Sequence, residues 1–399
     1  MQLNKRVVRG SVLVFYLLVG LEIVIMISPF AAYFYGVYGP LLNWLYSHPA
    51  TAWLTGFFLP HAVVANSAVL NFMNALGRTL FSVGILAFLF GAVQIYSAKF
   101  RRKGVVTGLL YRWVRHPQYL FLAIAGFGLL LFWPRFFILI LYVTMLFVYY
   151  LLARHEEQRM LNQYGESYRA YMQRTAMFLP GNPGAKLFRL LFGWVKQPGL
   201  ALALAYVTVL VLSVAAAFGL RKITIANISL AWLPQQEIAA ISITPRSEDE
   251  LRALVESALA DSAVNEALAG FREQGHRGFL VHVMPQHYMM QGLFLQPQQS
   301  SMPGRGRSWR GVLGFLFPFF SGHSHHDMMM RDTGGPVQMV VSQLTWPDGR
   351  YAAFDQALAF TVKHLPLLKL DFEPATGQVL VWTRTPPRNY WGQMPMPAY

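Results

Sequence analysis

The stretch Tyr111–Gly128, YRWVRHPQYLFLAIAGFG, joins a polar, basic segment directly to an apolar run. Arg115 and His116 stand immediately before Pro117, and the residues that follow are as apolar as those of a membrane-spanning helix. Proline has no backbone N–H, and it disfavours helical conformation in the residue before it. The pattern therefore predicts a helix that begins at Pro117 with His116 exposed at its start.

The composition of the whole chain is that of a membrane protein. Its 399 residues are 55% hydrophobic and only 13% charged, and the mean hydropathy is +0.36. The net charge of +15 is typical of basic cytoplasmic loops next to anionic lipid. No run of Lys and Arg with interleaved aromatic residues indicates a nucleic-acid partner. The chain has no cysteine, which excludes a disulfide, a thiolate metal site and a cysteine nucleophile.

Several stretches are apolar enough to cross a bilayer, which takes roughly 20 residues. Tyr119–Trp133 is apolar but short, and it is expected to form a tight hairpin with the span that follows. Residues 50–72, interrupted by Pro60, His61 and Asn66, are expected to form an external loop with interfacial helices. The long stretches are Ser11–Phe34, Leu80–Ala98, Phe136–Ala153 and Leu200–Leu220. The sequence therefore predicts an α-helical integral membrane core of about five transmembrane helices.

The basic residues predict how these spans are oriented. Lys and Arg cluster before the first span, between the second and third, and between the fourth and fifth, whereas residues 36–78 hold only Arg78. With five spans all three clusters lie on one side, and the positive-inside rule makes that side cytoplasmic. Arg221 and Lys222 are the exception, because they would lie just outside the fifth span. We expect a protein of the bacterial inner membrane with a cytoplasmic N-terminus.

Residues 1–222 are expected to form the membrane domain, and the composition changes after them. Residues 223–399 are expected to form an α+β domain. The odd number of spans places this domain outside the cytoplasmic membrane, in the periplasm. Ser247 and Glu250 make a capping box that is expected to open an amphipathic helix. Residues 295–336 are rich in Gly, Ser, Pro and His and are expected to form a flexible loop. Strands are predicted at KITIANISLAWL (222–233), GFLVHVMP (278–285) and VQMVVSQLTW (337–346), and a hairpin at residues 367–386.

The informative region is residues 104–180, where two polar elements flank the apolar hairpin. Both elements lie on the cytoplasmic side at opposite ends of that hairpin, so they are expected to meet. Their aromatic, acidic and basic side chains suit a ligand with a flat base, a ribose and a charged tail, and the hairpin offers a route for a lipophilic substrate. The residues brought together are Arg115, His116, Tyr119, Arg154, Glu156, Glu157, Tyr168, Tyr171 and Arg174.

The motifs in this region resemble those of a known superfamily. VTGLLYRWVRHPQY (106–119) is followed by RHEEQRMLNQYGESYRAY (154–171) and by FLP (178–180). This order is similar to that of the isoprenylcysteine carboxyl methyltransferase-like membrane methyltransferases, which include phospholipid N-methyltransferases. The resemblance covers roughly one fifth of the chain, and Leu109 stands where the family often has glycine.

The resemblance implies S-adenosylmethionine as the methyl donor, with a lipophilic or small-molecule acceptor. Methyl transfer from a sulfonium is an in-line displacement that depends mainly on proximity and orientation. Arg154 would position an anionic acceptor, and Glu157 would deprotonate a neutral one, so both are expected to be catalytic. The residues expected to bind the cofactor are Tyr111, Arg115, His116, Pro117, Gln118, Tyr119, Glu156, Tyr168 and Tyr171.

The C-terminal domain carries a second chemical signal. GHSHHDMMMRD (322–332) and VHVMPQHYMM (281–290) combine imidazole with thioether, a ligand set that suits copper. The predicted ligands are His323, His325 and His326. The alternative interpretation of these tracts is a loop with incidental, weak metal affinity.

Two other functions are consistent with the sequence. A sterol-reductase-like membrane reductase would share a related helical core and would use Arg101, Arg102 and Lys103 to bind the phosphate of NADPH. A non-catalytic core would instead anchor a periplasmic domain that binds a metal or a periplasmic protein. Binding assays with the two cofactors separate the first two functions, and copper titration tests the third.

Overall fold

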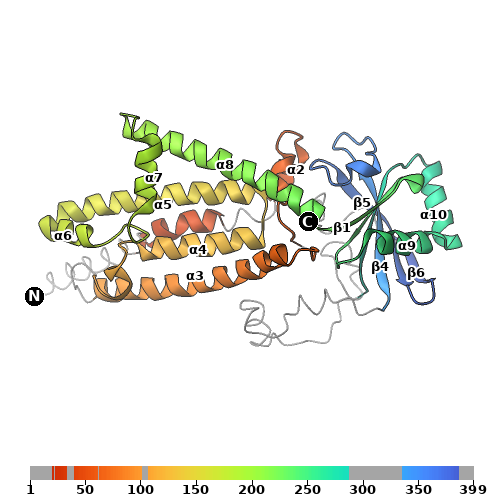
Figure 1. Cartoon of the computed structure of the whole chain (residues 1–399), viewed down its shortest axis with the longest axis horizontal. Coiled ribbons are helices and arrows are strands. Elements are labelled where there is room, and N and C mark those ends of the chain that lie inside the picture. Colours follow the sequence, from red (N-terminus) through yellow and green to blue (C-terminus); the bar gives the residue numbers. More distant parts are fainter. Residues whose placement is uncertain are drawn as a thin grey trace, which may run out of the picture. The chain divides into compact units, whose positions relative to one another are not determined.

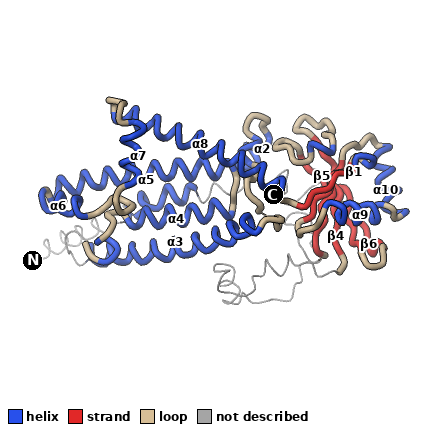
Figure 2. The backbone as a smooth tube through the Cα atoms, viewed as in Figure 1, coloured by secondary structure: helices blue, strands red, loops and turns tan. Residues whose placement is uncertain are grey.

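The computed structural model describes residues 20–21, 23–33, 40–61, 63–100, 107–286 and 335–385. The chain divides into two compact units. The first unit consists of residues 1–37, 80–130 and 138–214, and the second of residues 38–79, 131–137 and 215–399. In the described part of the chain the first unit is helical, whereas all the named strands belong to the second (Figure 2).

Long helices dominate the amino-terminal half of the chain (Figure 1). They are α3 (Ala68–Phe100), α4 (Pro117–Phe132), α5 (Phe136–Tyr164) and α8 (Pro198–Ala226). The short helices α6 (Glu166–Arg174) and α7 (Pro183–Phe192) lie between α5 and α8, and a 3-10 turn, η2 (Leu109–Arg112), precedes α4. The chain therefore places a helical hairpin, α4–α5, between η2 and α6.

Among the described residues, three helices are long and apolar enough to cross a membrane: Ala68–Ala98, Phe136–Tyr164 and Pro198–Ala226. Two shorter apolar helices, Ile23–Tyr33 and Pro117–Phe132, accompany them. Candidate membrane-spanning helices are thus present as predicted, whereas the predicted number of five is not established, and residues 11–19 of the predicted first span lie outside the described residues. The helices are also longer than predicted, because α3 takes in residues 68–72 of the expected external loop and α5 continues to Tyr164.

Small residues let the helices of the first unit approach closely. A Cβ added at Gly84 on α3 would lie 2.6 Å from the backbone nitrogen of Ala125 on α4. A Cβ added at Gly126 would lie 2.8 Å from the Met145 side chain on α5, and the Gly126 carbonyl accepts a 2.7 Å hydrogen bond from the Tyr33 hydroxyl. Packing of this kind is typical of helices in lipid, where close backbone contact replaces the hydrophobic effect.

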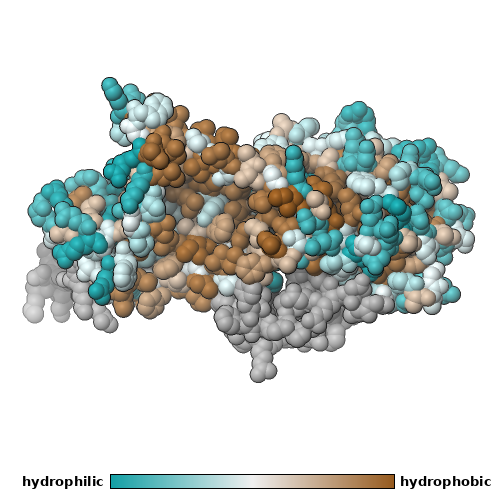
Figure 3. Space-filling view, viewed as in Figure 1, coloured by the Kyte–Doolittle hydropathy of each residue, from teal (hydrophilic) through white to brown (hydrophobic). Residues whose placement is uncertain are grey.

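The outer faces of these helices are apolar. Large hydrophobic side chains are exposed along α3 and α8, and Figure 3 shows hydrophobic atoms over the visible face of α8. These exposed residues include Val83, Leu86, Leu89, Phe90 and Val93 on α3, and Leu200, Val207, Val211 and Leu212 on α8. An apolar surface of this extent is expected of helices that face lipid.

In the second unit, two buried arginines donate hydrogen bonds to backbone carbonyls of segments that are neither helix nor strand. After α2 (Pro40–Ser47) and η1 (Ala52–Thr55), the described residues 56–61 and 63–67 contain no helix, in line with the predicted loop. Arg135 donates to the Thr55 carbonyl, and its guanidinium lies 4.0 Å from the centre of the Phe57 ring. Arg221 donates to the carbonyls of Phe57 (2.6 Å) and Leu358 (2.7 Å). Arg221, the exception to the charge rule, thus satisfies backbone groups of this loop.

The second unit also contains a six-stranded sheet. Its order is β1-β2-β3-β4-β5-β6, and all neighbouring strands are antiparallel except β2 and β3. Helices α9 (Glu248–Leu259) and α10 (Ser262–Glu273) lie in the crossover between these two parallel strands. The strands are β1 (Ser229–Leu233), β2 (Ile238–Ser242), β3 (Phe279–Pro285), β4 (Val337–Thr345), β5 (Lys363–Glu373) and β6 (Gln378–Arg384).

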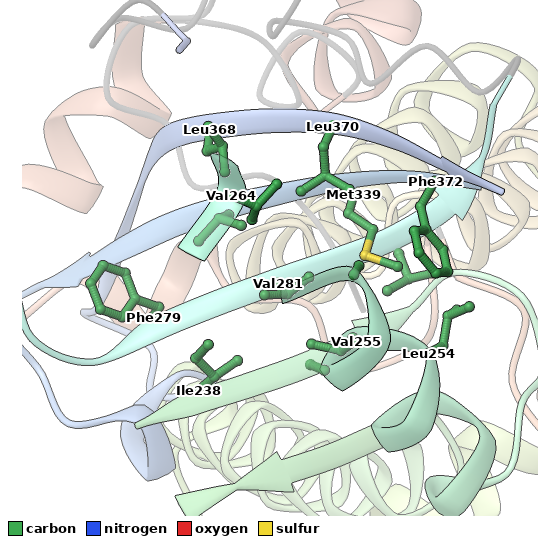
Figure 4. Close-up of a cluster of buried hydrophobic side chains, with 14 of the residues drawn as sticks. Ile238, Leu254, Val255, Val264, Phe279, Val281, Met339, Leu368, Leu370 and Phe372 are labelled. Carbon is green, nitrogen blue, oxygen red and sulfur yellow. The ribbon is translucent and has the colours of Figure 1, made fainter. Parts of the chain in front are cut away.

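The two faces of the sheet bury separate apolar clusters. The first includes Val255, Val281 and Met339 and collects side chains from the sheet and both helices (Figure 4). The second, on the opposite face, includes Leu280 and Val340. Alternate residues of a strand point to opposite faces, which explains why neighbouring residues such as Leu280 and Val281 join different clusters.

Most sequence predictions for the second unit are confirmed, and one is wrong. Ser247 accepts a hydrogen bond from the Glu250 backbone and Glu250 caps Ser247 in return, as the capping box predicts. Strands β3 and β4 and the β5–β6 hairpin also lie where they were predicted. Residues 222–226, predicted to begin a strand, instead form the last turns of α8, because the helix continues beyond the apolar run.

Candidate active site

The polar segment before α4 is joined to the segment after α6 by backbone pairing. Val114 and Ala176 form a parallel bridge, and the Arg115 backbone N–H donates to the Ala176 carbonyl at 2.8 Å. The His116 N–H donates to the Met177 carbonyl at 3.1 Å. The ends of residues 114–176 therefore meet, and this pairing fixes the backbone that carries Arg115 and His116.

Helix α4 begins at Pro117, as the sequence predicts. The His116 carbonyl accepts the first helical hydrogen bond, from the Leu120 N–H at 3.2 Å. The His116 side chain is only 3% exposed, however, so the expectation that it is exposed at the helix start is wrong. The Phe178 ring, whose centre lies 6.0 Å from that of His116, and two glutamates from α5 surround it.

His116 lies between the two consecutive glutamates of α5. Its Nδ1 is 3.3 Å from an oxygen of Glu156, and its Nε2 is 3.4 Å from an oxygen of Glu157. Burial alone would lower the pKa of this histidine, but hydrogen bonding to the two carboxylates and their charges together raise the pKa above its usual value. The protonated imidazolium is therefore favoured between the two acids.

Arg115 ties three elements together. Its Nε donates to Glu157 at 2.6 Å, and its Nη1 donates to the carbonyls of Met172 (3.1 Å) and Thr175. The Arg115 and Glu157 side chains are 7% and 9% exposed, so the pair is almost completely withdrawn from solvent. The N–H groups of Arg115 thus donate hydrogen bonds to Glu157 on α5 and to carbonyls at the end of α6.

Glu156 has a different environment from Glu157. One of its oxygens accepts a hydrogen bond from the Tyr119 hydroxyl, and its side chain remains 27% exposed. The Tyr119 ring stacks on Tyr149 of α5 at 4.8 Å and lies 5.7 Å from the ring of His116. Glu156 is therefore held by two donors and is also the more accessible of the two acids.

A second set of contacts fixes the predicted tyrosines. The Tyr111 hydroxyl donates to Gln118 at 2.9 Å, and the Tyr171 hydroxyl donates to the Tyr111 carbonyl at 2.6 Å. Tyr168 is buried, with its ring 5.7 Å from that of Tyr171. Burial raises the pKa of Tyr111 well above its usual range and that of Tyr171 to about 12, so both hydroxyls remain protonated donors.

The structure brings together all the residues expected to bind the cofactor, but not Arg154. That side chain is exposed on α5, and within the described residues its guanidinium makes no hydrogen bond or ion pair. Sequence reasoning missed Tyr149, Thr175 and Phe178. Tyr149 precedes Glu156 by seven residues, a spacing that places both on one helix face, and this spacing was the signal that would have found it.

The predicted metal ligands His323, His325 and His326 lie outside the described residues. Within the described ranges, no group of three or more His, Asp or Glu side chains is arranged to hold a metal ion. Arg101, Arg102 and Lys103, the phosphate-binding residues of the reductase alternative, likewise lie outside the described residues.

A comparison with protein-family models matches the segment that contains this site. Residues 73–167 match the phospholipid methyltransferase family. The matched methyltransferase segment covers roughly a quarter of the chain, and it includes both the Arg115–Tyr119 element and the Glu156–Glu157 pair. Comparisons with curated proteins and with solved structures gave no match.

The family match confirms the resemblance drawn from the motifs and supports a membrane methyltransferase. Methyltransferases of this family in general use S-adenosylmethionine. The apolar helices α3, α5 and α8 agree with a protein embedded in a membrane.

Proposed function

We propose that this protein is an integral-membrane methyltransferase that transfers a methyl group from S-adenosylmethionine to a lipophilic or small-molecule acceptor. The observation that carries the proposal is the contact between the two motif elements. Tyr119 donates to Glu156, and His116 lies between Glu156 and Glu157, although the elements are separated by a complete helical hairpin. The match of the same segment to a methyltransferase family supports the proposal independently.

Glu156 is the residue best placed to receive the cofactor. It is partly accessible, and Tyr119 and His116 hold it in position. A carboxylate in this position would accept hydrogen bonds from the ribose hydroxyls or the α-ammonium group of S-adenosylmethionine. The hydroxyls of Tyr111 and Tyr171 are engaged within the protein, so we assign these tyrosines to the wall that shapes the site.

The reaction requires little from the protein beyond position. When bound, S-adenosylmethionine would supply an electrophilic methyl group to the acceptor atom, and its sulfonium sulfur would leave as a neutral thioether when the bond to the methyl carbon breaks. Most of the rate enhancement would come from holding the acceptor in line with the breaking bond. No metal ion is required by this scheme.

The surroundings of Glu157 and Arg154, the two residues expected to be catalytic, differ in how well they suit a catalytic role. Glu157 is paired with Arg115 and is almost completely buried, so removing a proton from an acceptor would leave Arg115 without its partner. We therefore assign Glu157 a positioning role, in place of the base proposed from the motif. Arg154 is exposed and has no partner within the described residues, so it remains available to pair an anionic acceptor.

We further propose that the site opens to the cytoplasmic side of a bacterial inner membrane, with the N-terminus on the same side and residues 223–399 in the periplasm. The distribution of basic residues supports this orientation. The lipid bilayer would supply a lipophilic acceptor through the apolar surface of the helices, and a periplasmic protein or metal would be the partner of the C-terminal domain.

Calorimetric titration of detergent-solubilised protein tests the proposal. S-adenosylmethionine or its demethylated product should bind to the wild type, and His116→Ala and Glu156→Ala should each weaken binding at least tenfold. Glu166→Ala is the matched control, because Glu166 is an exposed glutamate that pairs with Arg169 at the surface. Wild-type protein that binds neither ligand ends the proposal.

The same titration includes NADPH. If the protein binds NADPH but not S-adenosylmethionine, the reductase function is favoured over the methyltransferase function. Binding of neither cofactor would favour the non-catalytic anchor.

A further inference from the structure

Two histidines are buried in the sheet of the second unit, and neither belongs to residues 73–167, which match the methyltransferase family. His282 is on β3 and His364 is on β5, and they are 0% and 7% exposed. The centres of their rings are 6.0 Å apart, with an angle of 52° between the ring planes. The rings therefore meet across the intervening strand β4, although the residues are far apart in the sequence.

Three of the four ring nitrogens of His282 and His364 have no hydrogen-bond partner among the described residues. His364 Nε2 lies 2.9 Å from the Ala357 carbonyl, which can only accept, so this nitrogen carries the proton. His364 Nδ1 and both ring nitrogens of His282 make no hydrogen bond within the part of the chain that the structure describes. The hydroxyl of Ser342, on β4, is also buried there without a partner. Buried polar atoms are normally paired, so such a group calls for an explanation.

A shared metal ion explains both the separation and the missing partners. With metal–nitrogen bonds of about 2 Å, two imidazoles on one ion have ring centres about 5–6.5 Å apart. The observed 6.0 Å falls within that range. A metal-binding histidine also usually donates its other N–H to a carbonyl or carboxylate, as His364 does to Ala357. Burial lowers the pKa of His282 to about 3 and that of His364 to about 4, which keeps both rings in the neutral form that binds metals.

The surroundings favour a monovalent, soft ion. No third His, Asp or Glu joins the pair among the described residues, so a divalent ion would be buried without counter-charge. Zinc would also lack its usual four ligands. The register aligns Met284 with Gln338, His282 with Val340 and His364 with Leu344, so Met284 lies on the far side of His282 from His364 and cannot bind the same ion. Two neutral imidazoles can hold Cu(I) in two-coordinate, nearly linear geometry, and imidazole is a ligand that suits copper.

We propose that His282 and His364 form a buried, two-coordinate Cu(I) site in the sheet of the C-terminal domain. This site differs from the tract of His323, His325 and His326, and it does not depend on the methyltransferase activity. Because the rings are buried, the ion enters while the domain folds or opens.

The experiment uses the full-length protein, produced in cells supplied with copper and purified without oxygen. Copper content is measured by mass spectrometry, and the ligand set by X-ray absorption. We expect about one copper per chain, with two nitrogen ligands at about 2 Å and no sulfur ligand. The triple variant His323→Ala/His325→Ala/His326→Ala should retain this copper, whereas His282→Gln or His364→Gln should lose at least nine-tenths of it.

Two further variants are controls. Met284→Leu preserves the volume of a buried side chain on the far side of His282 from His364, and it should leave copper content unchanged. His276→Ala, which removes a histidine that bonds to Gln343 in the same domain, should leave copper content unchanged. The proposal is overturned if the wild type holds no copper above the level of the His282→Gln variant, or if its copper is lost in the triple variant. A wild-type chain that holds only ordered water at these nitrogens gives the first of these results.

Discussion

At the scale of single residues, Arg115 is the centre of the candidate site. Its guanidinium joins Glu157 on α5 to the carbonyls of Met172 and Thr175 at the end of α6. Removing one partner of a buried ion pair leaves the other charge uncompensated. We therefore propose that Arg115 holds the acids in place and that its neighbours contact the cofactor.

Replacing Arg115 by alanine should destabilise the solubilised protein by about 3 kcal/mol, because Glu157 would remain buried without a counter-charge. Affinity for the demethylated cofactor should fall together with stability. Arg112→Ala is the control, because Arg112 is exposed on η2, and it should change the free energy of unfolding by less than about 0.5 kcal/mol. Chemical unfolding followed by tryptophan fluorescence measures both variants, and equal effects would contradict this role.

His116 makes the stability of the site depend on pH. Its pKa is raised in the folded protein, so its contribution is complete below the unfolded value of about 6.5 and is lost as the pH rises through the folded value. The melting temperature of the wild type should therefore fall from pH 6.5 to pH 9 more steeply than that of His116→Gln. Parallel curves for the two proteins would show that the imidazolium does not stabilise the fold.

The difference between the two glutamates was not predictable from the sequence. Consecutive residues on a helix point about 100° apart, so one of them must face away from Arg115. Which one does so depends on the rotation of α5 about its axis, and packing against α4 sets that rotation. The meeting of the two motif elements was predictable, because a helical hairpin returns the chain to the side from which it started.

At the scale of elements, the contact between α3 and α4 depends on one missing side chain. A Cβ at Gly84 would approach the backbone of Ala125 to 2.6 Å, whereas a Cβ at Gly91 would meet only the Leu110 side chain at 3.7 Å. Both glycines lie on α3, so replacing either by alanine should bring the same gain in intrinsic helix propensity.

Gly84→Ala and Gly91→Ala should therefore have opposite effects. Alanine at position 91 should stabilise α3 by up to about 1 kcal/mol, because it has the higher helix propensity. Alanine at position 84 should lower the melting temperature, because α3 and α4 must move apart. Thermal unfolding in detergent compares the variants, and stabilisation by both would mean that the helices do not pack closely at Gly84.

Elements with strong local signals were predicted correctly, and those without them were not. The capping box at Ser247 and the alternating pattern of the β5–β6 hairpin are local signals, and both elements formed as expected. Strand β2 (Ile238–Ser242) is buried along its whole length and therefore has no alternation to detect. The carboxyl end of α8 was mistaken for a strand, because β-branched residues there imitate strand composition.

At the scale of the whole molecule, the lack of cysteine makes the orientation directly measurable. Gln173 on α6 and Ala375 in the β5–β6 turn are both exposed. In cells with a permeabilised outer membrane, an impermeant maleimide should label Ala375→Cys. It should label Gln173→Cys only after lysis, and the wild type gives no background. Labelling in the reverse order would place the C-terminal domain in the cytoplasm.

The bridge between Val114 and Ala176 has a consequence for how such a chain diversifies. Because the main chain enters and leaves the α4–α6 loop at adjacent points, the loop is closed by its own backbone. The acids and the histidine between them are held by contacts within this loop and by Met177 and Phe178, which follow it directly. We therefore expect that the segment after Phe178 can be shortened or replaced in this chain without changing the distance between His116 and the two glutamates.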